Sequence, residues 1–428
     1  MFSQQGLSLD QAPPISVVLR FFLSGALFGI FSGIFILFFG IKIFDTNSTE
    51  AIILTHTLTL GVMLSFMFAA LFQMLPVIAG VKLTAPTVKA SLVQFPLIFG
   101  VPILLFAFYT HKSIFFVIAS LLLGVSILSI AFIMLKNLLK LPNHSTSSKG
   151  ITIALVSLII LTILALYLTS TLSGFIQGSH YAQFKVAHYS FGLFGWVIVL
   201  IISISFQVIE MFYVTPSYPK VISQYLPLTL LVILITTIIA VTFMPNSWLF
   251  SHLIIALLLT LYALLTLKRL TQKKRPLVDA TVWFWRLGLT ILIVSMSIML
   301  ITPFWDIAPL RSLSYIFFSG FSLSIVFAMF YKIVPFLTWF HLNSQGYFTA
   351  PMMHEVIHPQ TAMKHLYIHI GVLLTFVLSV FAAPLIYIAG ILTLLSFGWM
   401  LWQIVYAWKL YLYIQRTGKK FNMNIRGE

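Results

Sequence analysis

Residues whose chemistry could serve a function gather on one hydrophobic stretch, residues 185–220. This stretch carries His188, Gly192, Gly195 and the carboxylate Glu210. At helical spacing these side chains fall on one stripe. Histidine nitrogen binds heme iron and copper, and glycines leave a flat groove in which a porphyrin face or a neighbouring helix can lie. The stripe therefore predicts either a cofactor site at His188 or a close helix contact in which His188 hydrogen-bonds a neighbour.

The spacing of this stretch recurs on two other hydrophobic stretches. Gly195 is followed twelve residues later by Gln207, and Glu210 comes three residues after that. The same offsets give Gly61, Gln73 and Pro76 on an earlier stretch and Gly320, Lys332 and Pro335 on a later one. One register on three stretches indicates an internal repeat.

The composition places all three stretches in a lipid bilayer. Of the 428 residues, 60% are hydrophobic and 7% charged, and the mean hydropathy is +1.07. A chain of this kind cannot bury its apolar surface in a water-soluble core. Cysteine is absent, which excludes disulfides, iron–sulfur clusters and thiolate metal sites. A metal ion or heme would need His, Met, Tyr or carboxylate ligands.

Hydropathy divides the chain into twelve membrane-spanning segments. Lipid allows only helices or closed barrels, and unbroken apolar runs of about 20 residues are helices, so we expect an all-α polytopic membrane protein. The polar N-terminus has no cleavable signal pattern, so we expect the first span to be retained. The predicted spans are 17–43, 50–79, 88–110, 113–136, 150–174, 184–214, 221–243, 247–267, 281–304, 311–340, 364–384 and 386–412.

The distribution of Lys and Arg predicts the orientation. With the N-terminus inside, 19 of the 24 basic residues fall at the inner side. The outer side keeps four: Lys42, Lys112, Lys185 and Arg311. This bias predicts cytoplasmic termini in a bacterial inner membrane. It also assigns the net charge of +16 to short inner loops, which argues against nucleic-acid binding.

The repeat divides the spans into groups. The marked stretches are spans two, six and ten of twelve, so a single membrane domain of residues 1–428 would contain three consecutive four-helix units, approximately 1–140, 141–275 and 276–428. Each unit starts on the same side of the membrane. The units are therefore expected to be parallel and related by pseudo-threefold symmetry about the membrane normal.

Two motifs on these spans carry a resemblance. The run from His56 to Gly61 reads HTLTLG and leads to QMLP, and the run from His188 to Gly192 reads HYSFG and leads to YVTP. Both resemble the marked helices of the heme-copper oxidase catalytic subunit (subunit I) superfamily, and equally the NnrS-type heme and copper membrane proteins linked to nitric oxide tolerance. The resemblance implies twelve helices in three arcs of four, with His56 at a low-spin heme position and His188 at a copper position.

The ligand set of the oxidases is incomplete in this chain. The tenth span, 311–340, contains no histidine, and Tyr315 stands at the place that corresponds to His56. The seventh span also lacks the paired histidines that hold copper in that superfamily. We therefore expect a degenerate member and no complete oxygen-reducing terminal oxidase. If the chain is an enzyme, the resemblance implies an oxidoreductase.

The remaining histidines are weaker candidates. His252 enters its span from the outer side and is a second candidate metal ligand, whereas His111 and His180 lie in outer loops. His365 and His369 share a helix face. The preceding inner loop contains His341, His354, Glu355 and His358. Together with these residues, His365 and His369 would form either a cytoplasmic metal site or an interfacial histidine cluster.

Two ionisable side chains are expected inside the membrane. A charge there costs about 2.5–3.5 kcal/mol on insertion scales, so such groups are normally paired or functional. We predict that Glu210 pairs with Lys332 in an inner polar cluster at the level of Gln73 and Gln207. The pair would be a clamp between units or part of a proton or ion route.

Different classes of function remain open at this point. The first is a membrane protein that binds heme, with copper as a second candidate cofactor, and acts in electron transfer or in handling NO or O2. Its partners would be other respiratory subunits or a separate electron carrier, because the chain has no CxxCH site or dinucleotide motif. The second is a secondary transporter that uses the Glu/Lys pair. The third is a membrane subunit without cofactors.

Overall fold

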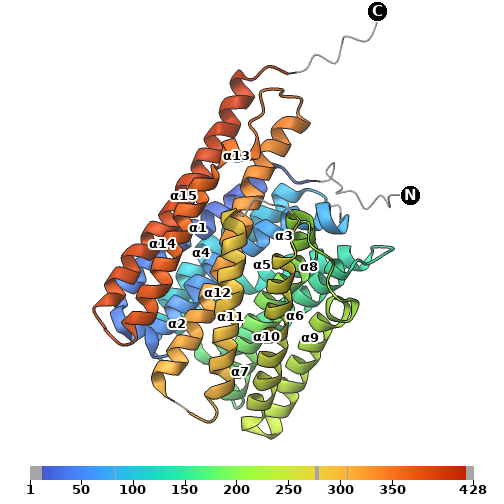
Figure 1. The fold of residues 1–428 in the computed structure, drawn as a ribbon. Helices are drawn as coiled ribbons and strands as arrows, with labels where there is room; N and C mark the ends of the chain where they lie inside the picture. Colours follow the sequence, from blue (N-terminus) through green and yellow to red (C-terminus); the bar gives the residue numbers. More distant parts are fainter. Residues whose placement is uncertain (1–11, 82, 275–278, 306, 421–428) are drawn as a thin grey trace, which may run out of the picture.

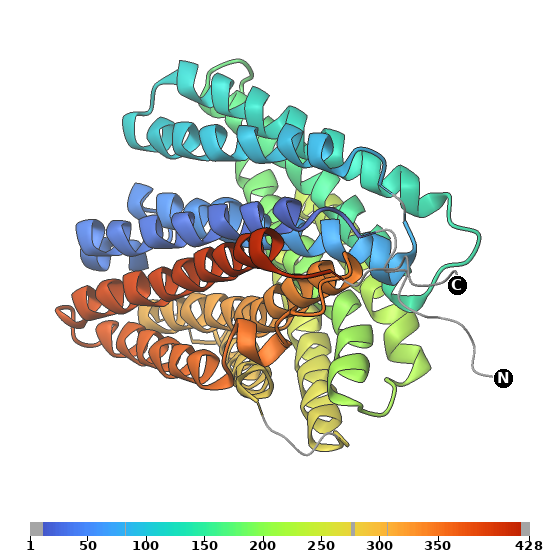
Figure 2. The ribbon, with the colours of Figure 1, turned by 90° about the horizontal axis from the view of Figure 1, so that it is seen from above.

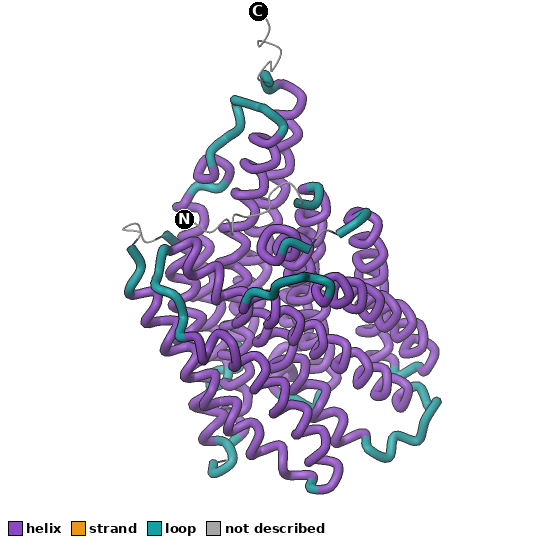
Figure 3. The backbone as a smooth tube through the Cα atoms, turned by 90° about the vertical axis from the view of Figure 1, so that its right-hand side faces the viewer, coloured by secondary structure: helices purple, strands orange, loops and turns teal. Residues whose placement is uncertain are grey.

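The computed structural model describes residues 12–81, 83–274, 279–305 and 307–420. Within these ranges the chain forms helices and no strands (Figure 3). Twelve helical segments are long and apolar enough to span a membrane. This confirms the all-α polytopic class, with lipid covering the outward faces.

The twelve spans follow the predicted order. The largest shift of a boundary is five residues, for example at the eleventh span, which begins at 359 instead of 364. Two short helices, η5 (Pro245–Ser247) and α13 (Met353–Val356), lie in connections. The spans are α1 (Ile15–Phe39) with η2 (Gly40–Phe44); α2 (Thr49–His56), η3 (Thr57–Met63) and α3 (Leu64–Ala79); α4 (Pro86–Thr110); α5 (Ser113–Leu139); α6 (Thr146–Leu172); α7 (Tyr181–Ser190), η4 (Phe191–Ile198) and α8 (Val199–Tyr213); α9 (Lys220–Phe243); α10 (Trp248–Thr271); α11 (Ala280–Ile301); α12 (Ala308–Ser344); α14 (Pro359–Ser379); and α15 (Leu385–Thr417).

Polar residues at the span ends define where several helices begin. The side chains of Ser48, Ser145 and Asp279 accept hydrogen bonds from backbone N–H groups in the first turns of α2, α6 and α11. These N–H groups have no partner within the helix, so the caps stabilise the helix starts. The second and sixth spans also contain π-helical segments, η3 and η4, whereas α12 is a continuous α-helix.

The helices form a closed bundle in which the first and last spans meet. α1 packs along α15, and Figure 2 shows the two side by side. α1 begins and α15 ends at the same end of the bundle (Figure 1), which we call the termini face; the other end is the far face. The termini face is the one that the charge distribution predicts to be cytoplasmic.

The three spans that share one sequence register are also the most buried. In their most hydrophobic windows 78%, 83% and 56% of the residues are buried, against 50% or less in every other span. Side chains of α3, α8 and α12 line a small apolar cavity of about 60 Å³ in the bundle interior. Phe66, Leu200 and Met329 are among the lining residues. The repeated pattern therefore marks the inner helices of the bundle.

Candidate functional site

The two histidines of the predicted cofactor site lie at equal depth in their spans. His56 is the last residue of α2, seven residues after its start, and His188 lies seven residues into α7. At 1.5 Å per residue both are about 10 Å from the far-face ends of their spans. Each is followed by a π-helical segment, a feature that is rare and often found at functional sites.

The structure brings these two histidines together. The ring centroids of His56 and His188 are 6.3 Å apart, and the ring planes are inclined by 17°. Both side chains are partly accessible rather than sealed. Sequence reasoning placed them at similar depth, and the fold places them next to each other.

A backbone carbonyl orients the imidazole of His56. His56 Nδ1 is 2.8 Å from the carbonyl oxygen of Ile52. A carbonyl can only accept, so Nδ1 carries the proton and Nε2 keeps a free lone pair. His188 Nδ1 is buried and has no hydrogen-bond partner within the described ranges. A backbone carbonyl at Nδ1 is the usual way in which a metal-binding histidine is oriented.

The distance between the ring centroids is close to the value expected for two imidazoles bound to one metal ion. A metal–imidazole bond is about 2.0–2.1 Å long, and a ring nitrogen lies roughly 1 Å from its ring centre, so two imidazoles on opposite sides of one ion have centroids about 6 Å apart. The observed value is 6.3 Å. Two nitrogen donors are too few for a structural zinc site but suffice as the axial ligands of a heme iron.

Gly192, beside His188, is not held to glycine by close packing. It lies one helical turn after His188, and a Cβ atom at this position would meet only Leu161, at 3.5 Å or more. At Gly61, by contrast, a Cβ atom would lie 2.6 Å from the ring of Phe28, and at Gly195 it would lie 3.0 Å from Ser157. Gly61 and Gly195 therefore allow close helix contacts, whereas packing does not require Gly192.

Two further predicted residues lie beside the histidine pair rather than in it. His252 is 5% exposed, and both of its ring nitrogens have partners: the Trp248 carbonyl at 2.7 Å and Ser190 Oγ at 3.1 Å. It has no free lone pair for a metal ion in this arrangement. Tyr315 is half exposed and lies in the neighbourhood of Tyr189.

The histidines near the termini face do not gather into a metal site. Within the described ranges, no group of three or more His, Cys, Asp or Glu side chains is placed to hold a metal ion. The predicted cytoplasmic metal cluster is therefore absent from this part of the chain. His358 instead caps α14, and Glu355 accepts a hydrogen bond from the backbone of Met352. His365 and His369 are buried inside the bundle.

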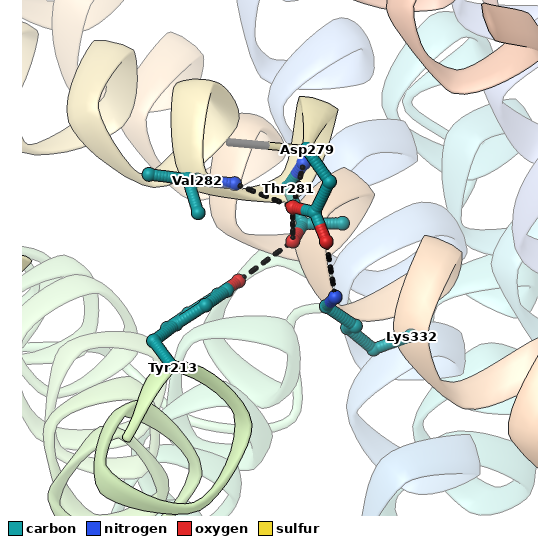
Figure 4. Close-up of polar contacts among 5 residues, drawn as sticks. All are labelled: Tyr213, Asp279, Thr281, Val282 and Lys332. Atoms are coloured by element: carbon teal, nitrogen blue, oxygen red, sulfur yellow. Dashed lines mark hydrogen bonds and ion pairs between the residues drawn. The ribbon is translucent and has the colours of Figure 1, made fainter. Parts of the chain in front are cut away.

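The predicted pairing of Lys332 needs a correction. Among the described residues, Lys332 forms its ion pair with Asp279 and not with Glu210 (Figure 4). Asp279 caps α11, and its Oδ1 accepts from Thr281 Oγ1 at 2.5 Å. Tyr213 on α8 is 2.8 Å from the same Thr281 hydroxyl. This cluster joins the second and third predicted units.

The other members of the predicted inner cluster form no hydrogen bond or ion pair with Lys332 within the described ranges. Glu210 accepts a hydrogen bond from the backbone N–H of Tyr218 at 3.1 Å, and Gln207 is half-buried. Gln73 is 4% exposed, and neither polar atom of its amide has a partner within the described ranges. Burial raises the pKa of Tyr218 to about 12, so this tyrosine stays protonated.

Asp279 is the functional residue that sequence reasoning missed. It lies just outside its predicted span, so a search for intramembrane charges does not find it. A signal was present: Asp279 immediately precedes an apolar run, which is the pattern of a helix N-cap.

Comparisons with known proteins assign no family to the chain. No protein-family model matches it, and no curated protein matches it.

Proposed function

We propose that the protein is an integral membrane heme protein that holds one heme iron between His56 and His188 and transfers electrons near the far face. The observation that carries this proposal is the histidine pair: 6.3 Å between ring centroids, nearly parallel ring planes, and a His56 Nδ1 that donates to the Ile52 carbonyl.

The roles of the residues follow from their positions. His56 and His188 would each bind through Nε2, and the Ile52 carbonyl fixes the ring of His56. Phe108, whose ring centroid is 4.9 Å from that of His56, provides an apolar wall that limits access of water. Heme in such a site supplies one-electron redox chemistry, and the axial ligands and surrounding polarity tune its potential.

Electron transfer fits this arrangement better than gas handling. His56 and His188 would hold the heme together, and a heme held by two histidines would supply one-electron transfer rather than binding of NO or O2. A single copper ion bound by the two imidazoles is the second candidate cofactor, because it needs the same separation. The absence of histidine from residues 311–340 of α12 supports an oxidoreductase component rather than a complete terminal oxidase. Its electron partner would be another chain.

We further propose the oxidase-like architecture for the whole bundle. The burial of the three register-sharing spans supports three four-helix units with pseudo-threefold symmetry. The basic residues support a cytoplasmic termini face, in a bacterial inner membrane. The chain has no cysteine, so single-cysteine variants test the orientation. Ser173→Cys at the far face should react with a membrane-impermeant maleimide in intact cells, whereas Thr417→Cys should not; the reverse pattern contradicts the orientation.

Absorption spectroscopy tests the proposed cofactor. The full chain, purified in mild detergent, should show a Soret band that shifts on reduction, with about one iron per chain. His56→Ala and His188→Ala should lose the band, and His180→Ala, an exposed histidine near the same face, should keep it. A colourless, metal-free protein would contradict the proposal and favour a transporter or a subunit without cofactors. Copper without iron would favour the copper site.

A further inference from the structure

A groove on the outer face of α5 combines apolar and basic side chains. It has a volume of about 340 Å³ and is lined by Phe132, Leu135, Lys136, Leu139 and Lys140, which follow one another at helical spacing. Phe132 is 53% and Leu139 62% exposed, and both lysines are exposed. Figure 2 shows α4 and α5 along one edge of the bundle. The groove therefore faces the surrounding lipid.

The two lysines of the groove lie at the depth of lipid head groups. α5 has 27 residues, and Lys136 is in its last turn, at the termini face. At 1.5 Å per residue the helix is about 40 Å long, whereas the hydrocarbon core of a bilayer is about 30 Å thick. The last turn thus reaches the level of the phosphates, and Phe132 lies deeper, beside the acyl chains.

Lys136 and Lys140 have no carboxylate partner within the described ranges. The sequence contains no Asp or Glu from residue 51 to residue 209. The carboxylates that flank this stretch are used elsewhere: Glu50 pairs with Lys42, and Glu210 accepts a hydrogen bond from the backbone of the loop that follows α8. The two positive charges on α5 must therefore be balanced by water or by an anion from outside the chain.

The neighbouring helix ends add to the same charge. α4 and α6 both pack against α5 and both begin at the termini face. Lys89 lies in the first turns of α4 and Lys149 in the first turns of α6. Lys89 donates a hydrogen bond to Thr84 Oγ1, a neutral group, at 2.9 Å. This sector of the termini face is thus basic over three helices, and such a cluster attracts anionic lipid head groups.

The spacing of the two lysines favours one shared anion. Lys136 and Lys140 are four residues apart, so their ammonium groups lie on the same helix face and repel each other. An anion between them relieves this repulsion. A phosphate group has several acceptor oxygens and can accept charge-assisted hydrogen bonds from both ammonium groups at once.

One class of molecule matches both parts of the groove. A phospholipid with a net negative charge supplies a phosphate for the lysines and an acyl chain for the apolar side chains below them. A zwitterionic phospholipid carries its own ammonium group, which the same lysines repel. An acidic segment of another protein could reach the lysines, but its backbone polar groups would have no partners in the deeper, apolar part of the groove.

We propose that the groove on α5 binds one anionic phospholipid at the termini face. The phosphate lies between Lys136 and Lys140, and one acyl chain lies along Phe132, Leu135 and Leu139. The site requires no cofactor, so it stands independently of the heme proposal.

Native mass spectrometry of the full chain tests the head-group contact. The protein is taken from nanodiscs with equal amounts of phosphatidylglycerol and phosphatidylcholine of the same acyl chains, and the lipids that remain bound are identified. We expect phosphatidylglycerol to be retained in preference, and Lys136→Gln with Lys140→Gln to lower its occupancy about tenfold or more. Lys409→Gln with Arg416→Gln removes two exposed charges of α15 near the same face and is the matched control. Equal losses in the two double variants, or no preference between the lipids, would overturn the site.

Two further measurements test the acyl-chain contact and separate a lipid from a free phosphate. Leu139→Trp fills the groove from an exposed position and should lower the occupancy of phosphatidylglycerol, whereas Phe99→Trp, at an exposed position of α4 outside the groove, should not. Glycerol phosphate, which has the head group without acyl chains, should not displace the lipid at millimolar concentration. Displacement by glycerol phosphate, or equal occupancy in the two tryptophan variants, would overturn the lipid as the occupant. Circular dichroism of each variant verifies that its helical content is unchanged.

Discussion

Lys332 and Asp279 show how one charge in the membrane determines a contact between helices. A lysine in a span costs about 2.5–3.5 kcal/mol on insertion scales unless it finds a partner or reaches the interface. Lys332 has a partner that lies at the interface, because Asp279 caps α11 at the edge of the span. The side chains keep 17% and 35% of their surface exposed, so solvent weakens the pair.

Removing the lysine should destabilise the fold moderately. Lys332→Met leaves Asp279 without its charged partner, and we expect the free energy of unfolding to fall by about 1–2 kcal/mol. Asp279→Asn should have a smaller effect when Lys332 is already replaced. Thermal unfolding in detergent measures both. The exposed pair Lys42–Glu50, 3.4 Å apart, provides the control: Lys42→Met should cost less than about 0.5 kcal/mol. Equal effects at the two sites would contradict a structural role for Lys332.

The same pair predicts sensitivity to acid. Burial alone would raise the pKa of Asp279, but the Lys332 charge and the hydrogen bonds from Lys332, Thr281 and Val282 outweigh it and hold the pKa below its ordinary value. A carboxyl group with a lowered folded-state pKa contributes stability above its unfolded pKa, about 3.9 for aspartate, and loses it as the pH falls through the folded-state value. Between about pH 5 and about pH 3 the melting temperature should fall more steeply in wild type than in Asp279→Asn. Parallel curves would contradict the pKa assignment.

At the scale of elements, the two π-helical segments determine how the histidines face each other. Each segment widens the helix directly after its histidine. The helical turns that precede the segment are therefore rotated relative to the turns that follow it. α2 and α7 are therefore rotated with respect to α3 and α8. The π-helical segments, rather than the α-helical repeat alone, bring His56 and His188 together.

Shortening one π-helical segment should separate the histidines. Deleting Leu60 from η3 would restore a regular helix and rotate His56 by about 100° relative to α3. We expect the variant to insert into the membrane with unchanged helical content, by circular dichroism, but to lose the Soret band. Thr59→Ala, in the same segment, is the control and should keep it. A deletion variant with the wild-type spectrum would show that η3 does not position His56.

The sequence predicts the elements better than the contacts between them. The spans are predictable because hydropathy is a property of each segment by itself. His56 and His188 were recognisable from their motifs, but their proximity depends on η3 and η4, and no pattern predicts a π-helical segment. Asp279 was missed as the partner of Lys332 because it precedes its span. His365 and His369 were expected at the interface, since sequence position alone does not show that α12 and α15 cover them.

At the scale of the whole molecule, the contact between α1 and α15 closes the bundle. Gly29 of α1 lies directly against the ring of Phe397 on α15, where there is no room for a Cβ atom. Phe397 is 2% exposed, so its ring cannot move outward. The first and last spans, α1 and α15, are thereby held together along the membrane.

A methyl group at this contact should loosen the closure. Gly29→Ala overpacks the contact, and we expect a loss of about 1–2 kcal/mol in unfolding free energy, even though alanine favours helix. At Gly398, the next residue after Phe397, a Cβ atom would meet nothing within 4 Å. Gly398→Ala should therefore be neutral or stabilising by up to about 1 kcal/mol. Thermal unfolding compares them. Equal stability of the two variants would rule out a tight α1–α15 contact at Gly29.

The central claim is that His56 and His188 bind one metal ion from opposite sides. X-ray absorption spectroscopy of the purified chain at the iron and copper edges tests it most directly. The account predicts iron with four porphyrin nitrogens and two imidazole nitrogens at about 2.0 Å, and the loss of the bound iron in His188→Ala. A chain that contains no metal, or whose iron keeps both imidazoles in His188→Ala, would contradict it.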